Sequence, residues 1–197
     1  MISEKDKIFL LMLARETLKA CVKPHQAPSP ASLRIILSPA LQEPRGAFVT
    51  LYAQHAEEKT LRGCIGTILP HYPLHQAVIN NTIAAATQDP RFSRVTEEEL
   101  SNVALEINIL TLPKRIVSCE EIKLGRDGII FHHGGVQSVF LPAVPLQFGW
   151  DVPQMLSQLA LKAGLPPDAW QTGEAWFEIF QSEAVQEKIN VVSPEFF

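Results

Sequence analysis

The sequence predicts an α+β protein with a mainly antiparallel sheet and flanking helices. Two pairs of strand-like runs are each joined by a short polar or glycine-containing turn, which is typical of β-hairpins. The helical runs are inserted between these pairs, and strands and helices do not alternate regularly as they do around a parallel sheet. With 197 residues and 46% apolar residues, the chain can bury a core without disulfide or metal support.

The N-terminal region predicts one helix followed by a connector. Ser3 can cap a helix, with Asp6 three positions on as in a capping box, and Pro24 ends the helical run. Residues 24–32, PHQAPSPAS, form a proline-rich connector. Residues 33–45 contain two further prolines and are expected to form a long loop.

The runs GAFVTLYA and TLRGCIGTI, joined by HAEEK, predict a β-hairpin over residues 46–68. Side chains alternate between the two faces of a strand. We therefore expect Leu61 and Ile65 to face the core. Arg62 and Cys64 would share the opposite face, where they would line a cleft.

A helix is expected over residues 74–88, followed by a helical turn at 96–100. Residues 103–111, VALEINILT, alternate as a strand whose apolar side chains face the core. Glu106 and Asn108 would lie on the other face of that strand.

The C-terminal half predicts a second hairpin, a capped helix and a last strand. GIIFHHGG and VQSVFLP form the hairpin over residues 128–142, turning at its two glycines. Asp151 is a candidate N-cap for the next helix, and Gly164 is the glycine at its C-terminal end. Residues 175–185, AWFEIFQSEAV, alternate as one strand.

Charge and cysteine usage disfavour several functional classes. The net charge is -4, and the 17 basic residues are scattered singly apart from Lys114-Arg115, which disfavours a general nucleic-acid binder. The three cysteines lack a CxxC spacing, which disfavours a disulfide framework or zinc finger and favours a reducing cytoplasm. No segment has the roughly 18 to 20 apolar residues that span a bilayer, so no membrane partner is expected.

The histidines do not predict a metal site. His132 and His133 are adjacent in a strand and point to opposite faces, so they cannot bind one ion together. His71 and His75 lie on either side of Pro73, which prevents a regular helical pair. The sequence contains no HExxH, phosphate-binding glycine loop or GxSxG motif. We therefore expect neither a metal ion nor another cofactor.

The LRGCIG segment carries the main candidate site. Side chains two residues apart on a strand stand roughly 6.5 to 7 Å apart, close enough for Arg62 to favour the thiolate of Cys64. Gly63 and Gly66 would weaken the strand unless a neighbouring segment or a ligand approaches its backbone. The alternative is structural: Cys64 is a small buried apolar residue, Arg62 pairs with a carboxylate and the glycines form a bulge.

Two further polar positions have open interpretations. Asp89 and Arg91 flank a proline at a helix end, where they can form a local salt bridge. Alternatively, this loop presents Arg91 to the same cleft as Arg62, which gives a pocket for an anionic group. Glu106 is either a solvated carboxylate or the partner that orients Arg62.

Several segments occur in the order found in a known family. They are GAFVTL, LRGCIG, PLHQAV, DPRF, EEL, LEINIL, FLP, GWD and KAGLPPDAW. The chain resembles the AMMECR domain family, and most closely the bacterial AmmeMemoRadiSam branch. This resemblance implies an α+β fold with two unequal subdomains, and partners similar to Memo-like and radical-SAM proteins. We expect residues 1–197 to form one such domain, with intertwined subdomains and a cleft lined by residues 61–66.

The sequence departs from the family pattern at two positions. Ala143 stands where relatives commonly have a glutamine, and Ala160 stands where many have a cysteine. Cys64 would therefore have to act without a second thiol on that helix.

Three classes of function follow from these residues and from the resemblance. The first is an enzyme or enzyme component that uses thiol chemistry on a small anionic or carbonyl substrate. The second is a non-catalytic protein-interaction module, and the least favoured is a nucleic-acid-associated regulator. For the first class, the candidate catalytic residues are Cys64, Arg62 and Glu106, and the candidate ligand-binding residues are Gly63, Gly66, Asp89 and Arg91.

Overall fold

The computed structural model describes residues 2–22, 36–55 and 58–187, so the predicted connector at 24–32 lies outside the described residues. The chain divides into two compact units. The first takes in the described residues up to Ile109 and from Ala184 on, and the second spans Leu110–Glu183.

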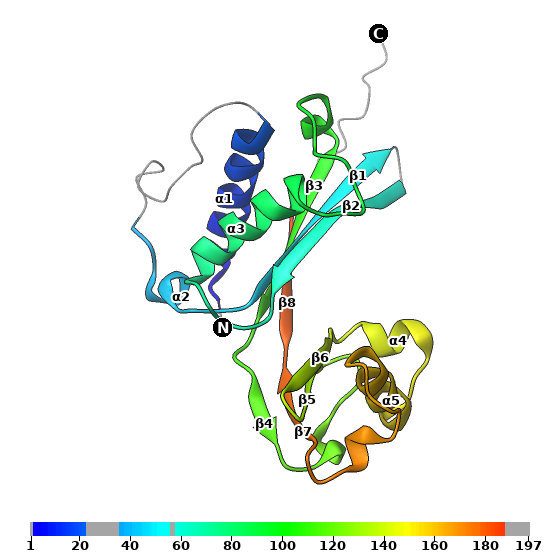
Figure 1. Cartoon of the computed structure of the whole chain (residues 1–197). Coiled ribbons are helices and arrows are strands. Elements are labelled where there is room, and N and C mark those ends of the chain that lie inside the picture. Colours follow the sequence, from blue (N-terminus) through cyan, green and yellow to red (C-terminus); the bar gives the residue numbers. More distant parts are fainter. Residues whose placement is uncertain (1, 23–35, 56–57, 188–197) are drawn as a thin grey trace. The chain divides into compact units, whose positions relative to one another are not determined.

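The first unit is a sheet covered on one face by helices (Figure 1). Its strands, in the order β2-β1-β3-β8, are β1 (Ala47–His55), β2 (Glu58–Thr67), β3 (Val103–Leu110) and β8 (Ser182–Gln186). Its helices are α1 (Glu4–Val22), α2 (Pro39–Gln42), α3 (Leu74–Thr87) and the 3-10 helix η1 (Glu98–Ser101). β1 pairs antiparallel with both β2 and β3, which confirms the predicted hairpin.

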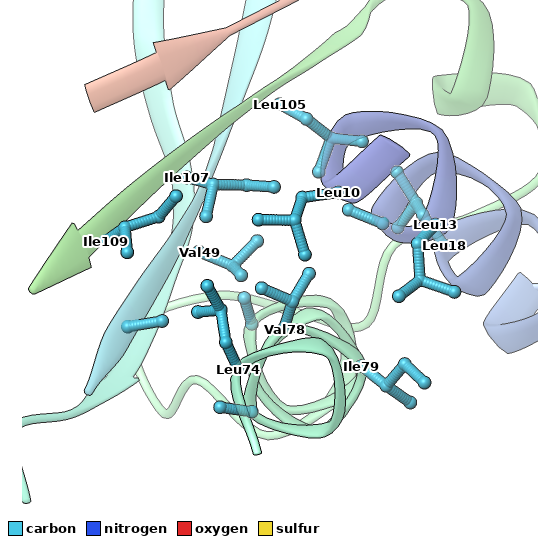
Figure 2. Packing of buried hydrophobic residues seen from close by; sticks show 14 of the residues in the cluster. Leu10, Leu13, Leu18, Val49, Leu74, Val78, Ile79, Leu105, Ile107 and Ile109 are labelled. Carbon is cyan, nitrogen blue, oxygen red and sulfur yellow. The ribbon is translucent and has the colours of Figure 1, made fainter. Parts of the chain in front are cut away.

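The core of the first unit lies between this sheet and the helices α1 and α3. In α3, Leu74, Val78 and Ala85 are buried at spacings of four and seven residues, about one and two helical turns, so they lie on one apolar face of the helix. Figure 2 shows how the side chains of these elements meet. The labelled residues are Leu10, Leu13 and Leu18 of α1, Val49 of β1, Leu74, Val78 and Ile79 of α3, and Leu105, Ile107 and Ile109 of β3.

Local signals explain where the elements of this unit begin. The Asp6 amide donates a hydrogen bond of 3.1 Å to Ser3 Oγ, as the predicted cap of α1 requires. The predicted turn at 96–100 corresponds to η1. Within 33–45, where a loop was expected, the described part contains the short helix α2, and a proline occupies its first position.

The second unit has its own antiparallel sheet. Its strands, in the order β4-β7-β5-β6, are β4 (Lys114–Ile116), β5 (Gly128–His133), β6 (Val136–Phe140) and β7 (Trp176–Phe180). Its helices are α4 (Val144–Phe148), α5 (Val152–Lys162) and the 3-10 helices η2 (Cys119–Glu121) and η3 (Ala169–Gln171). A separate apolar cluster joins its sheet to α5, including Phe131, Phe177 and Leu159.

Two predictions for this unit are confirmed. The β5–β6 hairpin turns at Gly134 and Gly135, whose φ angles of 53° and 88° suit glycine in a two-residue turn. Asp151 caps α5, because its Oδ1 accepts a hydrogen bond of 2.8 Å from the Gln154 amide. The two antiparallel sheets with flanking helices agree with the α+β class expected from the sequence.

The prediction of one strand over residues 175–185 is wrong. The segment forms β7 and β8, which belong to different sheets and are separated by Gln181. The Gln181 amide and carbonyl both bond Thr111, through the Thr111 hydroxyl and amide respectively, at 2.9 Å each. Gln181, Ser182 and Glu183 interrupt the apolar alternation, but such an interruption does not by itself indicate a change of sheet. In the described ranges, no helix is both long and apolar enough to cross a membrane.

Candidate functional site

The LRGCIG segment lies in β2, an edge strand of the first sheet, and contains a β-bulge. The pairing register shifts after Leu51, which leaves Arg62 without a partner on β1. Leu61 pairs with Tyr52 and is 40% exposed, so the prediction that Leu61 faces the core is wrong. Ile65 does pack against the core, as predicted. The extra residue in the bulge reverses the alternation on one side of it, which strict periodicity cannot anticipate.

Arg62 is bound by the segment that follows α3. Its Nε and Nη2 donate to the two carboxylate oxygens of Glu99, at 2.6 and 3.1 Å. It also donates to the carbonyl oxygens of Ser93 and Arg94, at 2.8 and 3.2 Å. These bonds hold β2 to the 93–99 segment. Glu106 is not among the partners of Arg62, so the expectation that Glu106 orients this guanidinium is not met.

Asp89 and Arg91 close the edge of β2 at Cys64. The Cys64 amide donates to Asp89 Oδ2 at 2.9 Å, and Arg91 Nη2 donates to the Cys64 carbonyl oxygen at 3.3 Å. Arg91 also donates to both oxygens of Asp89, at 2.9 and 2.7 Å, which confirms the expected local salt bridge. An edge strand presents unpaired amides and carbonyls. The Asp89–Arg91 pair therefore replaces a neighbouring strand at this one residue.

The electrostatics of this pair are those of a buried anion and a partly exposed cation. The side chain of Asp89 is 2% exposed and that of Arg91 is 54% exposed. The hydrogen bonds from Arg91 lower the pKa of Asp89 far below its usual range; burial opposes this shift, and the Cys64 amide adds to it. Asp89 is therefore ionised at neutral pH, and its charge fixes both the backbone of Cys64 and the guanidinium of Arg91.

The two glycines of the motif allow close approach by other parts of the chain. A Cβ atom on Gly63 would lie 2.4 Å from the carbonyl oxygen of Ala85 in α3. A Cβ atom on Gly66 would lie 2.2 Å from the ring of Phe48. Both positions thus have a packing explanation that requires no ligand, one of the two causes expected from the sequence.

The side chain of Cys64 lies on the sheet face opposite the core. Thr50 on β1 pairs with Cys64 on one side and with Glu106 of β3 on the other, so all three share a face. The Thr50 hydroxyl donates to Cys64 Sγ at 3.3 Å. Tyr52, two residues further along β1, lies on the same face. The thiol and the guanidinium of Arg62 therefore have different neighbours.

Glu106 is held by other residues of this face. Asn108 Nδ2 donates to it at 2.9 Å, and the side-chain Nε2 of Gln186 donates to its other oxygen. Lys59 Nζ lies 3.8 Å from Glu106 Oε2 and 3.8 Å from the centre of the Tyr52 ring. Burial, the charges of Glu106 and Cys64, and a hydrogen bond to Glu106 raise the pKa of Tyr52. We call the set Thr50, Tyr52, Lys59, Cys64 and Glu106 the thiol face.

The structure brings the sequence-predicted residues together in two groups. In the first group, Asp89 and Arg91 bind the backbone of Cys64. The guanidinium carbons of Arg91 and Arg62 lie 5.4 and 5.9 Å from the centre of the Phe92 ring. Glu106 belongs to the second group. Glu106 lies two strands from Cys64, about 10 Å across the sheet.

Sequence analysis missed four residues of the site: Thr50, Tyr52, Lys59 and Glu99. The alternation of polar Thr50 and Tyr52 with buried Val49 and Leu51 was the signal for the first two. Among the described residues, no three His, Cys, Asp or Glu side chains are gathered as a metal site requires.

The fold and the motif order agree with known proteins. The family model described as AMMECR1 matches residues 11–185. A protein of Methanocaldococcus jannaschii is 43% identical over 151 residues, which cover 74% of each chain. A protein of Thermococcus gammatolerans is 40% identical over 91% of this chain and 89% of its own length. The crystal structure of an uncharacterized protein from Pyrococcus horikoshii superposes with a TM-score of 0.80 and 36% identity, covering 95% of this chain and 94% of that one. The chain therefore belongs to the AMMECR1 family.

Proposed function

We propose that this AMMECR1-family protein uses the thiol of Cys64 as a nucleophile toward a small electrophilic substrate bound at the thiol face. One observation carries the proposal: the polar and glycine residues around Cys64 form structural contacts, whereas its thiol accepts a hydrogen bond from a hydroxyl group that can assist it. The residues with structural tasks are Arg62, Gly63, Gly66, Asp89 and Arg91.

The thiol face supplies the groups that nucleophilic addition to a carbonyl needs. The Thr50 hydroxyl donates to Cys64 Sγ, which stabilises negative charge on sulfur. In the addition, Sγ bonds to the carbonyl carbon, and the electron pair of the broken π bond moves to oxygen. The thiol proton passes through solvent to that oxygen, so the product is a neutral hemithioacetal and no redox partner is required. Arg62 acts indirectly in this scheme, by holding β2 in place.

Alkylation of the native protein tests the role of Cys64. Burial raises the pKa of the Cys21 and Cys119 thiols, so both are mostly protonated and slow to react near neutral pH. We expect iodoacetamide to modify Cys64 several-fold faster than the other two cysteines, as measured by peptide mass spectrometry. In denaturant the three rates should converge. If Cys64 reacts only after denaturation, it is a packing residue and not a nucleophile.

A second candidate is a non-catalytic module that binds partners similar to Memo-like and radical-SAM proteins, as the resemblance implies. The contacts that hold β2 in place also support this candidate. They fix the edge strand on which Leu61 is exposed beside the thiol face. The two candidates differ in one observable. An interaction module would bind such a partner equally well after Cys64→Ser substitution, whereas a thiol enzyme would lose its activity.

A further inference from the structure

The cations within the thiol face and next to it are already paired with carboxylates. Lys59 lies 3.8 Å from Glu106, and Arg91 donates two hydrogen bonds to Asp89. Arg62 forms a two-point bond with Glu99. Among the described residues in contact with LRGCIG, each of these positive charges therefore has a partner inside the protein.

The carboxylates of the two nearest pairs are more buried than their cations. Glu106 is 12% exposed and Lys59 is 39% exposed, and the same order holds for Asp89 and Arg91. An anion could pair with Arg91 only in competition with Asp89, which also binds the Cys64 amide. An anion next to Cys64 would meet the negative charge of Glu106 in partly buried surroundings, where charges interact more strongly than in water.

The hydrogen-bonding groups of the face suit an uncharged oxygen. Thr50 lies between Cys64 and Glu106, Tyr52 lies two residues further along β1, and both carry a hydroxyl group. A neutral carbonyl oxygen that approaches Cys64 displaces no ion pair and is not repelled by the charge of Glu106.

From these contacts we infer that the thiol face takes a neutral carbonyl compound, such as an aldehyde or ketone, and discriminates against anions. The inference rests on the proposed function, because it names the substrate class of the same site. It narrows the two substrate classes that the sequence leaves open, anionic or carbonyl, to the second. The negative charge of Glu106 repels anionic substrates, and the positive charge of Lys59 reduces this repulsion.

Two alkylating agents of different charge test this inference. Iodoacetamide is neutral and iodoacetate is anionic, and both transfer a similar group to sulfur with loss of iodide. The quantity to measure is the ratio of their rates at Cys64 at low salt, divided by the same ratio for Cys64 in the denatured chain. We expect the native ratio to favour iodoacetamide by at least about fivefold more than the denatured ratio, because of the charge of Glu106.

Two variants make the test specific. Glu106→Gln keeps the shape of the side chain and removes its charge, so the preference should fall toward the denatured value. Lys59→Met removes the compensating cation, so the preference should rise. Equal native and denatured ratios, with Cys64 still reactive, would overturn the inference and leave the proposed function intact. A Cys64 that reacts with neither agent until the protein is denatured would overturn both.

Discussion

Replacing Asp89 with alanine is expected to lower the free energy of unfolding by roughly 3 kcal/mol, because it removes a buried, ionised hydrogen-bond acceptor. The variant leaves the Cys64 amide without its partner at the edge of β2, and it leaves Arg91 without its counter-charge. Denaturant unfolding measures the change. Asp168→Ala is a matched control, because Asp168 is exposed and its side chain caps no helix. If Asp89→Ala lowers the unfolding free energy by less than about 1 kcal/mol, the contacts of Asp89 with Cys64 and Arg91 are not needed for stability.

The same carboxylate predicts a pH dependence. The pKa of Asp89 is lowered in the folded protein, so its contribution to stability is complete above its unfolded pKa, near 3.9. The contribution is lost as the pH falls from about 4 toward the folded-state pKa, because protons then bind the unfolded chain first. The unfolding free energy of the Asp89→Asn variant should therefore depend less steeply on pH below about 4 than that of the wild type.

Gly63→Ala is expected to cost about 3 kcal/mol of unfolding free energy, at the upper end of the usual range for overpacking. The added methyl group would meet the carbonyl oxygen of Ala85, a backbone atom that cannot turn away. Gly66→Ala should also destabilise the protein, because a Cβ atom there would lie 2.2 Å from the ring of Phe48 and 2.7 Å from the carbonyl oxygen of Ala47.

Gly173 provides the control for these two substitutions, since a Cβ atom there meets nothing within 4 Å. Denaturant unfolding should show that Gly63→Ala and Gly66→Ala are both destabilised well beyond Gly173→Ala. A Gly63→Ala variant within about 0.5 kcal/mol of the wild type would contradict the close packing of β2 on α3.

Elements with local signals could be predicted from the sequence. The hairpin over 46–68, the outward position of Glu106 and the cap at Asp151 depend on alternation or on contacts three residues apart. The family resemblance was also visible, because several motifs keep their order along the chain, and the family match confirms it.

The site residues show where local patterns stop being informative. The bulge at Arg62 depends on which residue β1 leaves unpaired, and alternation within β2 carries no such information. The partner of Arg62 is Glu99, 37 residues away, and three consecutive glutamates in the sequence offered no means of choosing among them. The division of 175–185 between two sheets is likewise decided by partners distant in sequence, β5 for one part and β3 for the other.

The residues around Cys64 shape β2, and we propose that the thiol of Cys64 itself serves function. The unfolding free energy of the Cys64→Ser variant separates a functional thiol from a packing residue. Serine retains a hydrogen-bonding group for Thr50 and removes the sulfur nucleophile. We expect the unfolding free energy of this variant to lie within about 0.5 kcal/mol of the wild-type value, because the thiol is not required for packing. A loss of about 2 kcal/mol or more would contradict it, because that is the cost of burying a hydroxyl where a thiol was needed for packing.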